Sequence, residues 1–577
     1  MDYMNTYKKW LESEFVDEAT KNELLSIKDN DTEIKESFYK ELEFGTAGLR
    51  GIIGAGTNRM NIYTVRKATQ GVCEDIKNCG EDYVKRGVVI AYDSRHKSHE
   101  FALEAAKVLA ANGIKVYLFD ELKPVPILSF SVRELGCARG IMITASHNPK
   151  EYNGYKVYGE DGGQLPPESA DYVMDILGKM DIFTDIKIIS EDQAKKEGLL
   201  QMVGEELENK FLAKVKEQSI DEESIAKLGD DFKIIYTPFH GTGNKPVRKI
   251  LDMIGIKNVR IVKEQEMPDP DFSTVKSPNP EEKEGFTIAI EMAKKEDIDL
   301  IIATDPDCDR VGIVVRDKEG NYITFTGNQV GTLLTEFILR SKKERGLLPS
   351  NGAVIKTIVT SDNIAPIAED YGIKVYNVLT GFKFIGEKIK AFEEGTLDNT
   401  YVFGFEESYG YLAGTHARDK DGVVASMLIA EMAANYKAQG MTLYDGLMAL
   451  YEKYGYYNDK LHTVTLKGID GSEKIKKIMA SFRANAPKDV AGIKVKDVWD
   501  VSNGTITHAD GSKDILDLPK SNVLKFILED GSWIAMRPSG TEPKIKFYFS
   551  INDKTKVAVD EKMDKISGEI IKMVEEF

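Results

Sequence analysis

The feature that most constrains the fold of this chain is the alternation of short apolar runs with stretches of helical period. Residues 87–91 read Gly-Val-Val-Ile-Ala, which is typical of a buried strand. Apolar side chains then recur at Phe101, Ala105 and Leu109, on one face of a helix, and residues 114–119 return to strand. Such strand–helix–strand units favour a parallel sheet that is covered by helices.

The same unit recurs along the first three quarters of the 577-residue chain. Further apolar runs of strand length occur at 233–236, 259–262, 299–303 and 353–356. We therefore predict a doubly wound α/β architecture with parallel or mixed sheets for this part of the protein.

Beyond Tyr456 the pattern of apolar residues changes to an alternating run at 462–466 and a strand-rich stretch at 523–550. This change predicts a smaller α+β domain at the C-terminus. Candidate junctions between domains are the charged stretch 214–231, the region 322–328 and the end of the helix-like segment 443–454.

Composition excludes several classes of protein. Lys and Arg number 77 against 94 Asp and Glu, and a net charge of −17 argues against a general nucleic-acid binder. The first thirty residues are charged, and no run approaches the roughly 18 apolar residues of a membrane span. Four cysteines without a paired or framework spacing argue against a disulfide scaffold and a structural zinc site. We expect a cytoplasmic protein that contacts neither nucleic acid nor membrane.

The first loop that suggests chemistry follows the apolar run 140–144. Residues 144–149 read Thr-Ala-Ser-His-Asn-Pro, and Lys156 follows a few residues later. Ligands bind beyond the carboxyl ends of strands in this fold class, so Ser146, with His147 beside it, is a candidate for contact with a ligand. A Ser-Asn-Pro turn is the alternative. A hydrolase nucleophile elbow is excluded, because Gly-x-Ser-x-Gly is absent.

The most specific loop follows the run 299–303 and carries Asp305, Asp307 and Asp309. Two carboxylates about 4 Å apart repel by roughly 4 kcal/mol at an effective dielectric of 20. A divalent cation with oxygen ligands removes that cost, and Mg²⁺ is the metal that we expect. An EF-hand is excluded, because Arg310 and Arg316 stand where its glycine and glutamate belong. A solvated acidic turn is the alternative.

Three carboxylates leave a hard cation with open positions, and a phosphoryl oxygen is the natural occupant. A phosphorylated Ser146 could supply that oxygen, which would connect the serine loop with the aspartate loop.

Two further loops suggest ligand binding. Residues 404–410 read Gly-Phe-Glu-Glu-Ser-Tyr-Gly, and carboxylates beside a hydroxyl suit vicinal sugar hydroxyls, although paired glutamates are often surface residues. Residues 537–544 read Arg-Pro-Ser-Gly-Thr-Glu-Pro-Lys, a candidate phosphate cradle or an ordinary polar turn. The glycine-rich segment 51–56 lacks the Walker pattern, and His240 is interpreted as a structural turn residue.

Taken together, the four loops resemble those of the α-D-phosphohexomutase superfamily and, within it, the bacterial phosphoglucomutases of the phosphoglucomutase/phosphomannomutase family. The resemblance covers essentially the whole chain and adds Phe-Gly-Thr-Ala-Gly-Leu-Arg-Gly at 44–51 and Arg-Asp-Lys-Asp-Gly at 418–422. It implies four domains around a central cleft. The expected domains are 1–212 with the phosphoserine loop, 213–324 with the metal loop, 325–455 with the sugar loop and 456–577 with the phosphate loop.

The resemblance also implies roles for individual residues. Ser146 would be the phosphoserine and would hold Mg²⁺ together with Asp305, Asp307 and Asp309. The transfer centre would be lined by Lys156, Arg50 and Arg310. The sugar would be bound by Thr380, Gly381, Lys383, Glu406, Ser408 and Lys420, and the non-reacting phosphate by Arg537, Ser539, Gly540 and Thr541.

Lys156 is the preferred general acid or base, because neighbouring cations could lower its pKa into a useful range. His147 is its rival, although we expect that residue to shape the serine loop.

The implied reaction is a reversible double phosphoryl transfer on small sugar phosphates, with glucose 1,6-bisphosphate as intermediate and activator. Phe405 precedes the paired glutamates, whereas forms that prefer mannose phosphates more often resemble Gly-Glu-Met-Ser-Gly, so glucose phosphates are expected. A phosphomannomutase, a phosphopentomutase of similar length, a serine-dependent phosphatase and a non-catalytic sugar-phosphate binder are the alternatives. Either a monomer or a dimer agrees with the sequence.

Overall fold

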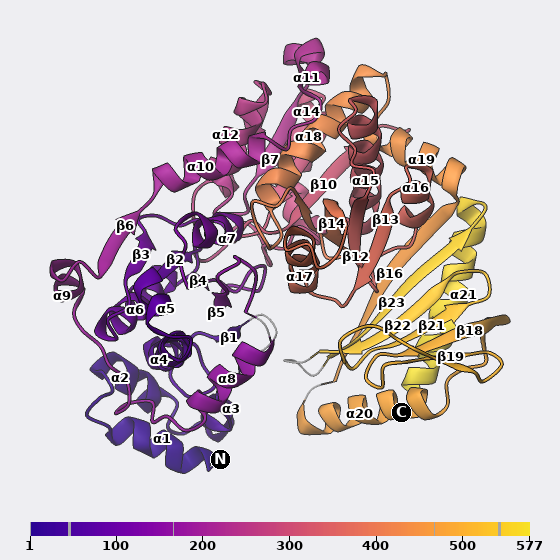
Figure 1. Ribbon diagram of the computed structural model, residues 1–577. Helices are drawn as coiled ribbons and strands as arrows, with labels where there is room; N and C mark the ends of the chain where they lie inside the picture. Colours follow the sequence, from indigo (N-terminus) through magenta and orange to yellow (C-terminus); the bar gives the residue numbers. More distant parts are fainter. Residues whose placement is uncertain (1, 44–47, 166, 467, 540–543) are drawn as a thin grey trace.

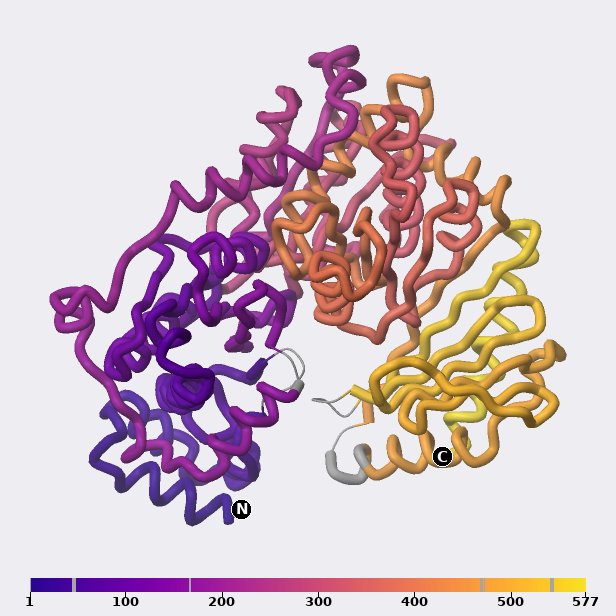
Figure 2. Tube along the Cα trace, viewed as in Figure 1, coloured from indigo at the N-terminus to yellow at the C-terminus, as the bar shows by residue number. Residues whose placement is uncertain are grey.

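A computed structural model describes residues 2–43, 48–165, 167–466, 468–539 and 544–577. Four domains follow one another along an arc, from the indigo N-terminal domain to the yellow C-terminal domain (Figures 1 and 2). Each domain has one sheet of its own. The predicted fold, three α/β domains followed by a smaller α+β domain, is confirmed.

Domain I has a six-stranded sheet in the order β1-β5-β4-β2-β3-β6. The apolar run at 87–91 forms β2, which is buried along its whole length because helices cover both faces of the sheet. The elements are α1 (Tyr3–Glu12), α2 (Glu18–Ser26), α3 (Asp31–Phe38), β1 (Leu49–Ile52), α4 (Ile62–Asn78), α5 (Glu81–Arg86), β2 (Val88–Tyr92), α6 (Ser98–Ala111), β3 (Val116–Phe119), α7 (Val125–Glu134), β4 (Arg139–Ile143), β5 (Tyr152–Tyr158), α8 (Pro167–Leu177), α9 (Glu191–Lys196) and β6 (Leu200–Val203).

Domain II has a five-stranded sheet in the order β11-β10-β9-β7-β8. Its elements are α10 (Glu205–Lys216), α11 (Glu222–Leu228), η1 (Gly229–Asp231), β7 (Ile234–Thr237), α12 (Asn244–Met253), β8 (Val259–Ile261), α13 (Lys263–Glu266), η2 (Lys283–Phe286), α14 (Thr287–Glu296), β9 (Leu300–Thr304), β10 (Val311–Arg316) and β11 (Tyr322–Thr324).

Domain III has a four-stranded sheet in the order β13-β12-β14-β15. Its elements are α15 (Gly327–Glu344), β12 (Gly352–Thr357), α16 (Ile364–Asp370), β13 (Lys374–Val378), α17 (Phe382–Glu393), β14 (Thr400–Glu406), β15 (Gly410–Ala413), α18 (Gly422–Ala438) and α19 (Leu443–Tyr454). Helix α18 is buried almost throughout and packs on α11, α12 and β15, which joins domains II and III in one apolar core.

The three α/β sheets share one topology. Three neighbouring strands run parallel, and a fourth returns antiparallel beside the last of them, in the orders β5-β4-β2-β3, β10-β9-β7-β8 and β15-β14-β12-β13. The connection from the last parallel strand to the returning strand is the serine loop in domain I, the aspartate loop in domain II and the glutamate loop in domain III. The fold therefore puts three chemically different loops at equivalent positions.

Domain IV has an antiparallel sheet in the order β16-β23-β22-β21-β18-β19-β20, with β17 paired to β18. Apolar residues of α20 and α21 form one core with this sheet, so the domain is of the predicted α+β type. The elements are β16 (Tyr456–Thr465), α20 (Gly468–Ala484), β17 (Asp489–Val490), β18 (Ile493–Asp500), β19 (Thr505–His508), β20 (Lys513–Ile515), β21 (Leu524–Leu528), β22 (Trp533–Pro538), β23 (Lys544–Asp553) and α21 (Lys556–Glu575).

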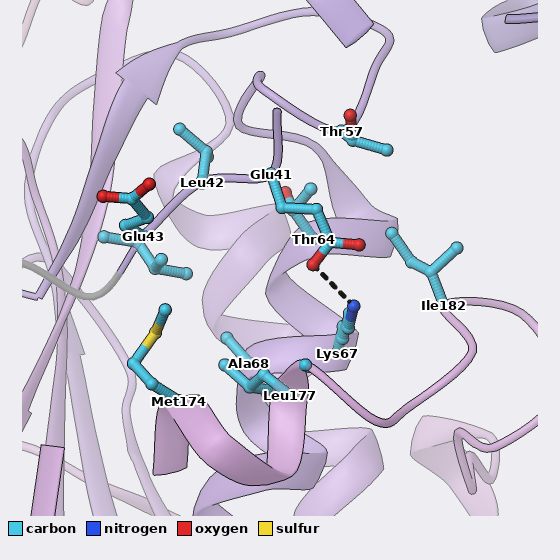
Figure 3. A pocket seen from close by; sticks show the side chains of 12 residues that line it. Glu41, Leu42, Glu43, Thr57, Thr64, Lys67, Ala68, Met174, Leu177 and Ile182 are labelled. Atoms are coloured by element: carbon cyan, nitrogen blue, oxygen red, sulfur yellow. Dashed lines mark hydrogen bonds and ion pairs between the residues drawn. The ribbon is translucent and has the colours of Figure 1, made fainter. Parts of the chain in front are cut away.

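The N-terminal helices add an aromatic cluster to domain I, in which the Trp10 ring meets the rings of Phe38, Tyr63 and Phe183 edge-on. A pocket of about 150 Å³ lies beside this cluster between α4 and α8, where Lys67 pairs with Glu41 at 2.8 Å (Figure 3). None of the helices in the described part of the chain combines the length and apolar character that crossing a membrane requires.

Candidate active site

The serine loop begins where β4 ends and presents Ser146 to the neighbouring domain. Ser146 has a left-handed backbone (φ 55°) and is 3% exposed. Its hydroxyl lies 3.1 Å from Asp305 Oδ2 and 3.2 Å from His147 Nδ1. The loop on the first sheet and the loop on the second therefore meet, as the sequence predicts.

The aspartate loop follows β9 and is buried between three domains. One carboxylate oxygen of each of Asp305, Asp307 and Asp309 lies within 4.8 Å of the others, and all three residues are at most 2% exposed. The backbone of the loop is fixed from domain I, where Val125 N–H donates to Asp307 O (3.0 Å), and from domain III, where Gly422 N–H donates to Cys308 O (3.0 Å).

The electrostatics of the aspartate triad show a crowded set of charges. Burial, followed by the neighbouring carboxylates, raises the pKa of Asp305 and of Asp309. Burial also opposes ionisation of Asp307, but the Lys156 ammonium beside it lowers the pKa of that carboxyl. Among the described residues, Asp307 Oδ1 and Asp309 Oδ1 have no hydrogen-bond partner. A cation between the carboxylates would relieve both the repulsion and the missing contacts.

The donor set of the triad fits a hard divalent cation. Three carboxylates and the oxygen on Ser146 are all hard oxygen ligands, which is the set that Mg²⁺ prefers. The two unpartnered carboxylate oxygens are the observation that supports this fit.

Lys156, on β5, reaches the triad from domain I. Its ammonium lies 2.9 Å from Asp307 Oδ2 and 3.8 Å from Asp309 Oδ2. The groups in contact with its ammonium are carboxylates, and the Lys420 ammonium approaches the same Asp309 Oδ2 at 3.1 Å. The physical reason is tertiary: β5 pairs with β4 and directs this side chain at the loop of the neighbouring domain.

Two arginines add further positive charge near the serine loop. Arg50, on β1, donates to Asn148 Oδ1 at 3.0 Å, and Arg310 pairs with Glu281 at 2.6 Å. Burial and then the nearby guanidinium groups of Arg310 and Arg50 lower the pKa of His147 well below its usual range. The imidazole beside Ser146 is thus neutral at neutral pH.

The glutamate loop between β14 and β15 lies across the cleft. Glu406 Oε1 accepts from Gly381 N–H at 2.8 Å, which connects it to the predicted Thr380-Gly381 loop. Burial raises the pKa of Glu406 to about 7, against the opposing charge of Lys420. Lys420 in turn lies 3.1 Å from Asp309 Oδ2, so the residues predicted to bind sugar and the triad form one charge network.

A single cleft of about 1650 Å³ connects the four domains. The predicted residues that line it are Arg50, His147, Arg310, Thr380, Gly381, Lys383, Glu406, Ser408, Lys420 and Arg537. Ser146, Lys156 and the three aspartates lie buried beside it. In the phosphate loop, Ser539 N–H donates to Lys544 O at 2.8 Å, and the predicted Gly540 and Thr541 lie outside the described residues.

Sequence reasoning missed several residues that contact the site. Glu281 pairs with Arg310, Glu407 accepts from Thr357 and Thr360, and Lys546 lines the cleft beside Arg537. Glu407 stood in the quoted loop, and both it and the adjacent Glu406 line the cleft. The partner of Arg310 was not accessible from the sequence, because 29 residues separate it from Glu281.

Comparison with protein families gives a match along most of the chain. Four models described as phosphoglucomutase/phosphomannomutase match in order: alpha/beta/alpha domain I at 41–181, domain II at 209–320, domain III at 326–454 and the C-terminal domain at 478–564.

A curated phosphoglucomutase of Staphylococcus haemolyticus is 38% identical over 530 residues, which cover 90% of this chain and 92% of that protein. Two solved structures have the same fold. A putative phosphomannomutase of Thermus thermophilus aligns with a TM-score of 0.68 at 23% identity, over 93% of this chain and 99% of that one. The phosphoglucomutase pp63/parafusin of Paramecium aligns at 0.67 and 19%, over 93% and 95%.

Proposed function

The chain belongs to the phosphoglucomutase/phosphomannomutase family and is an intramolecular phosphotransferase, and on that premise we propose that it interconverts glucose 1-phosphate and glucose 6-phosphate through a phosphoserine at position 146. The observation that carries the proposal is the 3.1 Å contact between the Ser146 hydroxyl and Asp305. It places a potential phosphoryl carrier against the one cluster of aspartates, among the described residues, that could hold a cation.

The proposed reaction has two balanced halves. In the first, the Oγ–P bond of phosphoserine 146 breaks while a bond forms between phosphorus and the free hydroxyl oxygen of the sugar monophosphate, and the proton of that hydroxyl passes through a base to the serine oxygen. In the second, the bond between the other phosphate of glucose 1,6-bisphosphate and its sugar oxygen breaks while the Ser146 oxygen bonds to that phosphorus, and the serine proton passes to the sugar oxygen. Exclusion of water from the cleft would favour transfer to sugar over hydrolysis.

Each group of residues has a role in this scheme. Asp305, Asp307 and Asp309 would hold Mg²⁺, which supplies positive charge against the phosphoryl oxygens when it is bound. Arg50 and Arg310 orient the serine loop and the wall of the cleft through their contacts with Asn148 and Glu281.

Lys156 is the proposed proton carrier, since its ammonium is buried in the transfer centre. His147 positions the serine hydroxyl through its ring nitrogen.

Substrate binding is proposed for the far side of the cleft. Glu406 and Ser408 would bind sugar hydroxyls, assisted by Thr380, Gly381, Lys383 and Lys420, and Arg537 with Ser539, Gly540 and Thr541 would bind the non-reacting phosphate. The Phe405 side chain is fully buried beneath this loop, between the rings of Phe403 and Tyr411. The name of the staphylococcal relative supports glucose phosphates over mannose or pentose phosphates.

We also propose the domain division at residues 212, 324 and 455. Three of the matched family segments fall entirely inside one proposed domain, and the segment 209–320 starts four residues before its own. Helix α10 runs across the first boundary.

The decisive experiment compares wild type with Ser146→Ala in a coupled assay for glucose 6-phosphate. We expect wild type to require Mg²⁺ and glucose 1,6-bisphosphate, to gain the mass of one phosphoryl group at Ser146, and to lose roughly 10⁴- to 10⁶-fold in turnover on substitution. Full activity of Ser146→Ala would remove the phosphoserine mechanism. Steady release of inorganic phosphate without isomerised sugar would favour the phosphatase alternative.

The identity of the sugar is tested separately. Rates on glucose 1-phosphate, mannose 1-phosphate and ribose 1-phosphate should rank with glucose first. A faster rate on either of the other two would replace glucose in the proposal and leave the transfer mechanism intact.

A further inference from the structure

Arg95 is a buried cation that the proposed mechanism does not use. It lies in the loop that follows β2, two residues after Asp93. Arg95 is 3% exposed, and its side chain extends behind the serine loop. Its guanidinium donates to four backbone carbonyls of that region: Ser146 O at 2.6 Å, Pro149 O at 2.8 Å, Tyr152 O at 3.1 Å, and Asn148 O. A guanidinium has five N–H donors in a rigid plane, so it can serve several acceptors at once.

These contacts hold the backbone of Ser146 in a strained conformation. Ser146 is a non-glycine residue with φ 55°, a conformation that persists only when its surroundings enforce it. By drawing the carbonyls of the loop to one side, Arg95 leaves the serine hydroxyl on the side that faces Asp305.

Asp93 completes the support of the serine loop. Its carboxylate lies 3.2 Å from Arg95 Nε and accepts from Thr144 Oγ1 at 2.6 Å, and Thr144 Oγ1 accepts from Ser146 N–H at 2.8 Å.

Domain II covers Arg95 from the other side. The Phe272 ring lies 5.0 Å from the guanidinium carbon, and Phe272 is itself buried with a positive φ of 47°. Its segment, Met267–Ser277, is fixed by His240, whose ring nitrogens lie 3.0 Å from Met267 O and 2.8 Å from Thr274 Oγ1. At the end of this segment, Ser277 Oγ donates to His147 O at 3.2 Å.

We infer that Arg95 is a positioning residue for phosphoryl transfer: it fixes the serine loop in the conformation that meets the aspartate triad, and the segment Met267–Ser277 of domain II, held by His240, secures it. This inference rests on the proposed function for its kinetic consequence. It also explains why His240, a motif residue outside the catalytic set, has both ring nitrogens engaged.

The inference predicts that loss of Arg95 affects turnover and leaves substrate binding nearly unchanged. Three of the four carbonyls that Arg95 contacts belong to the loop that bears the reacting oxygen, and the fourth belongs to Tyr152, the first residue of β5. The proposed sugar and phosphate contacts, in contrast, lie on domains III and IV. Loss of Arg95 should therefore lower kcat and the rate of phosphoserine formation, with little change in KM. Displacement of a reacting group by about 1 Å can lower a rate about 100-fold.

The first experiment measures kcat, KM and the rate of Ser146 phosphorylation by glucose 1,6-bisphosphate in Arg95→Gln and Arg95→Lys. We expect both variants to lose about 100-fold in kcat with KM within about threefold of wild type. Lysine should not rescue, since one ammonium cannot serve four carbonyls spread along a loop. Millimolar guanidinium should restore part of the kcat of Arg95→Ala, and ethylammonium at the same concentration should not.

Arg86 offers a matched control in the same domain. Its guanidinium also donates to two backbone carbonyls, pairs with Glu160 and lies 4.9 Å from the Tyr83 ring, but it has no contact with the serine loop. Arg86→Gln should keep the wild-type kcat. An equal loss of kcat in both arginine variants, or a loss confined to KM, would overturn the inference.

The domain II segment gives a second test that does not depend on removing a buried cation. Phe272→Leu and His240→Gln should each lower kcat about fivefold to tenfold, in the same direction as Arg95→Gln and with unchanged KM. Unchanged kcat in both variants would show that domain II does not secure Arg95.

Hydrogen exchange of the backbone amides of residues 146–148 and 150–152 separates this inference from the proposed function. Arg95→Gln should accelerate exchange of these amides about tenfold relative to wild type and to Arg86→Gln. If wild type has no mutase activity but the amides respond in this way, the proposed function fails and the positioning role stands. If wild type is an active mutase and neither exchange nor kcat responds, the positioning role fails alone.

Discussion

The serine loop of domain I and the glutamate loop of domain III occupy equivalent positions in the same topology, but groups of opposite charge fix their conformations. These groups are a guanidinium at the serine loop and carboxylates at the glutamate loop. The serine loop gives its carbonyl oxygens to the Arg95 guanidinium. In the glutamate loop it is the carboxylates that accept, Glu406 from Gly381 N–H and Glu407 from the hydroxyls of Thr357 and Thr360.

The difference shows how one sheet topology supports two kinds of recognition. Each loop follows a parallel strand and returns antiparallel, so the fold fixes where the loop lies. Cations around the serine loop suit an anionic phosphoryl group, and carboxylates in the glutamate loop suit the hydroxyl donors of a sugar. Position comes from the repeated topology and chemistry from the residues inserted into it.

The largest effect should come from the aspartate loop that the serine loop faces. Asp307→Asn should lower turnover about 10³-fold and weaken activation by Mg²⁺, because one hard ligand is lost. Stability to urea without Mg²⁺ should fall, because the buried Lys156 ammonium loses its carboxylate partner at 2.9 Å and keeps only Asp309 at 3.8 Å. Unchanged dependence of kcat on Mg²⁺ would count against the metal site. Asp317→Asn, in an exposed turn of the same domain, is the matched control.

The pH dependence of stability tests whether burial raises the pKa of the Glu406 carboxyl in the glutamate loop. Burial raises the pKa of Glu406 from 4.5 to about 7, so the folded protein binds more protons than the unfolded protein between these values. The contribution of Glu406 to stability therefore falls as pH rises from about 4.5 to about 7. Glu406→Gln should gain stability relative to wild type between pH 5 and pH 8 in urea unfolding, and its KM should rise about tenfold. An unfolding difference that does not vary with pH would contradict the shift.

Substitution of the serine in the glutamate loop compares the two loops directly. Ser408→Ala should raise KM for glucose 1-phosphate about fivefold, the loss of one hydrogen bond, while Ser146 still accepts a phosphoryl group. Intact mass after incubation with glucose 1,6-bisphosphate distinguishes the two serines. Phosphorylation that disappears in Ser408→Ala would mean that the loops are not separate in function.

The smallest effect should come from the anchor of the glutamate loop. Thr360→Ala removes one of the two hydroxyls that hold Glu407, which should raise KM about twofold and cost about 1 kcal/mol of stability. Thr335→Ala is the control, because Thr335 is equally buried and its hydroxyl donates to Gly331 O within α15. It should lose similar stability without a change in KM, and equal KM changes in both would remove the anchoring role.

Much of this architecture was accessible from the sequence because its causes are local. The apolar run at 299–303 is β9 with a shift of one residue, and the helix-like segment at 443–454 is α19. The polar loops at the strand ends were recognised because fold class alone places ligands there. The carboxylate partners of Lys156 were not accessible from the sequence, since they lie in a loop about 150 residues away in the chain.

The sequence by itself determined the layers, the strand ends and the residues that carry chemistry, because periodicity and loop composition act over a few neighbouring residues. Only the tertiary structure decided that three loops occupy equivalent places, that the Ser146 hydroxyl meets Asp305, and that Arg95 lies between the serine loop and Phe272. The contacts of Ser146 with Asp305 and of Arg95 with Phe272 join residues 159 and 177 positions apart, and the packing of domain I against domain II brings them together.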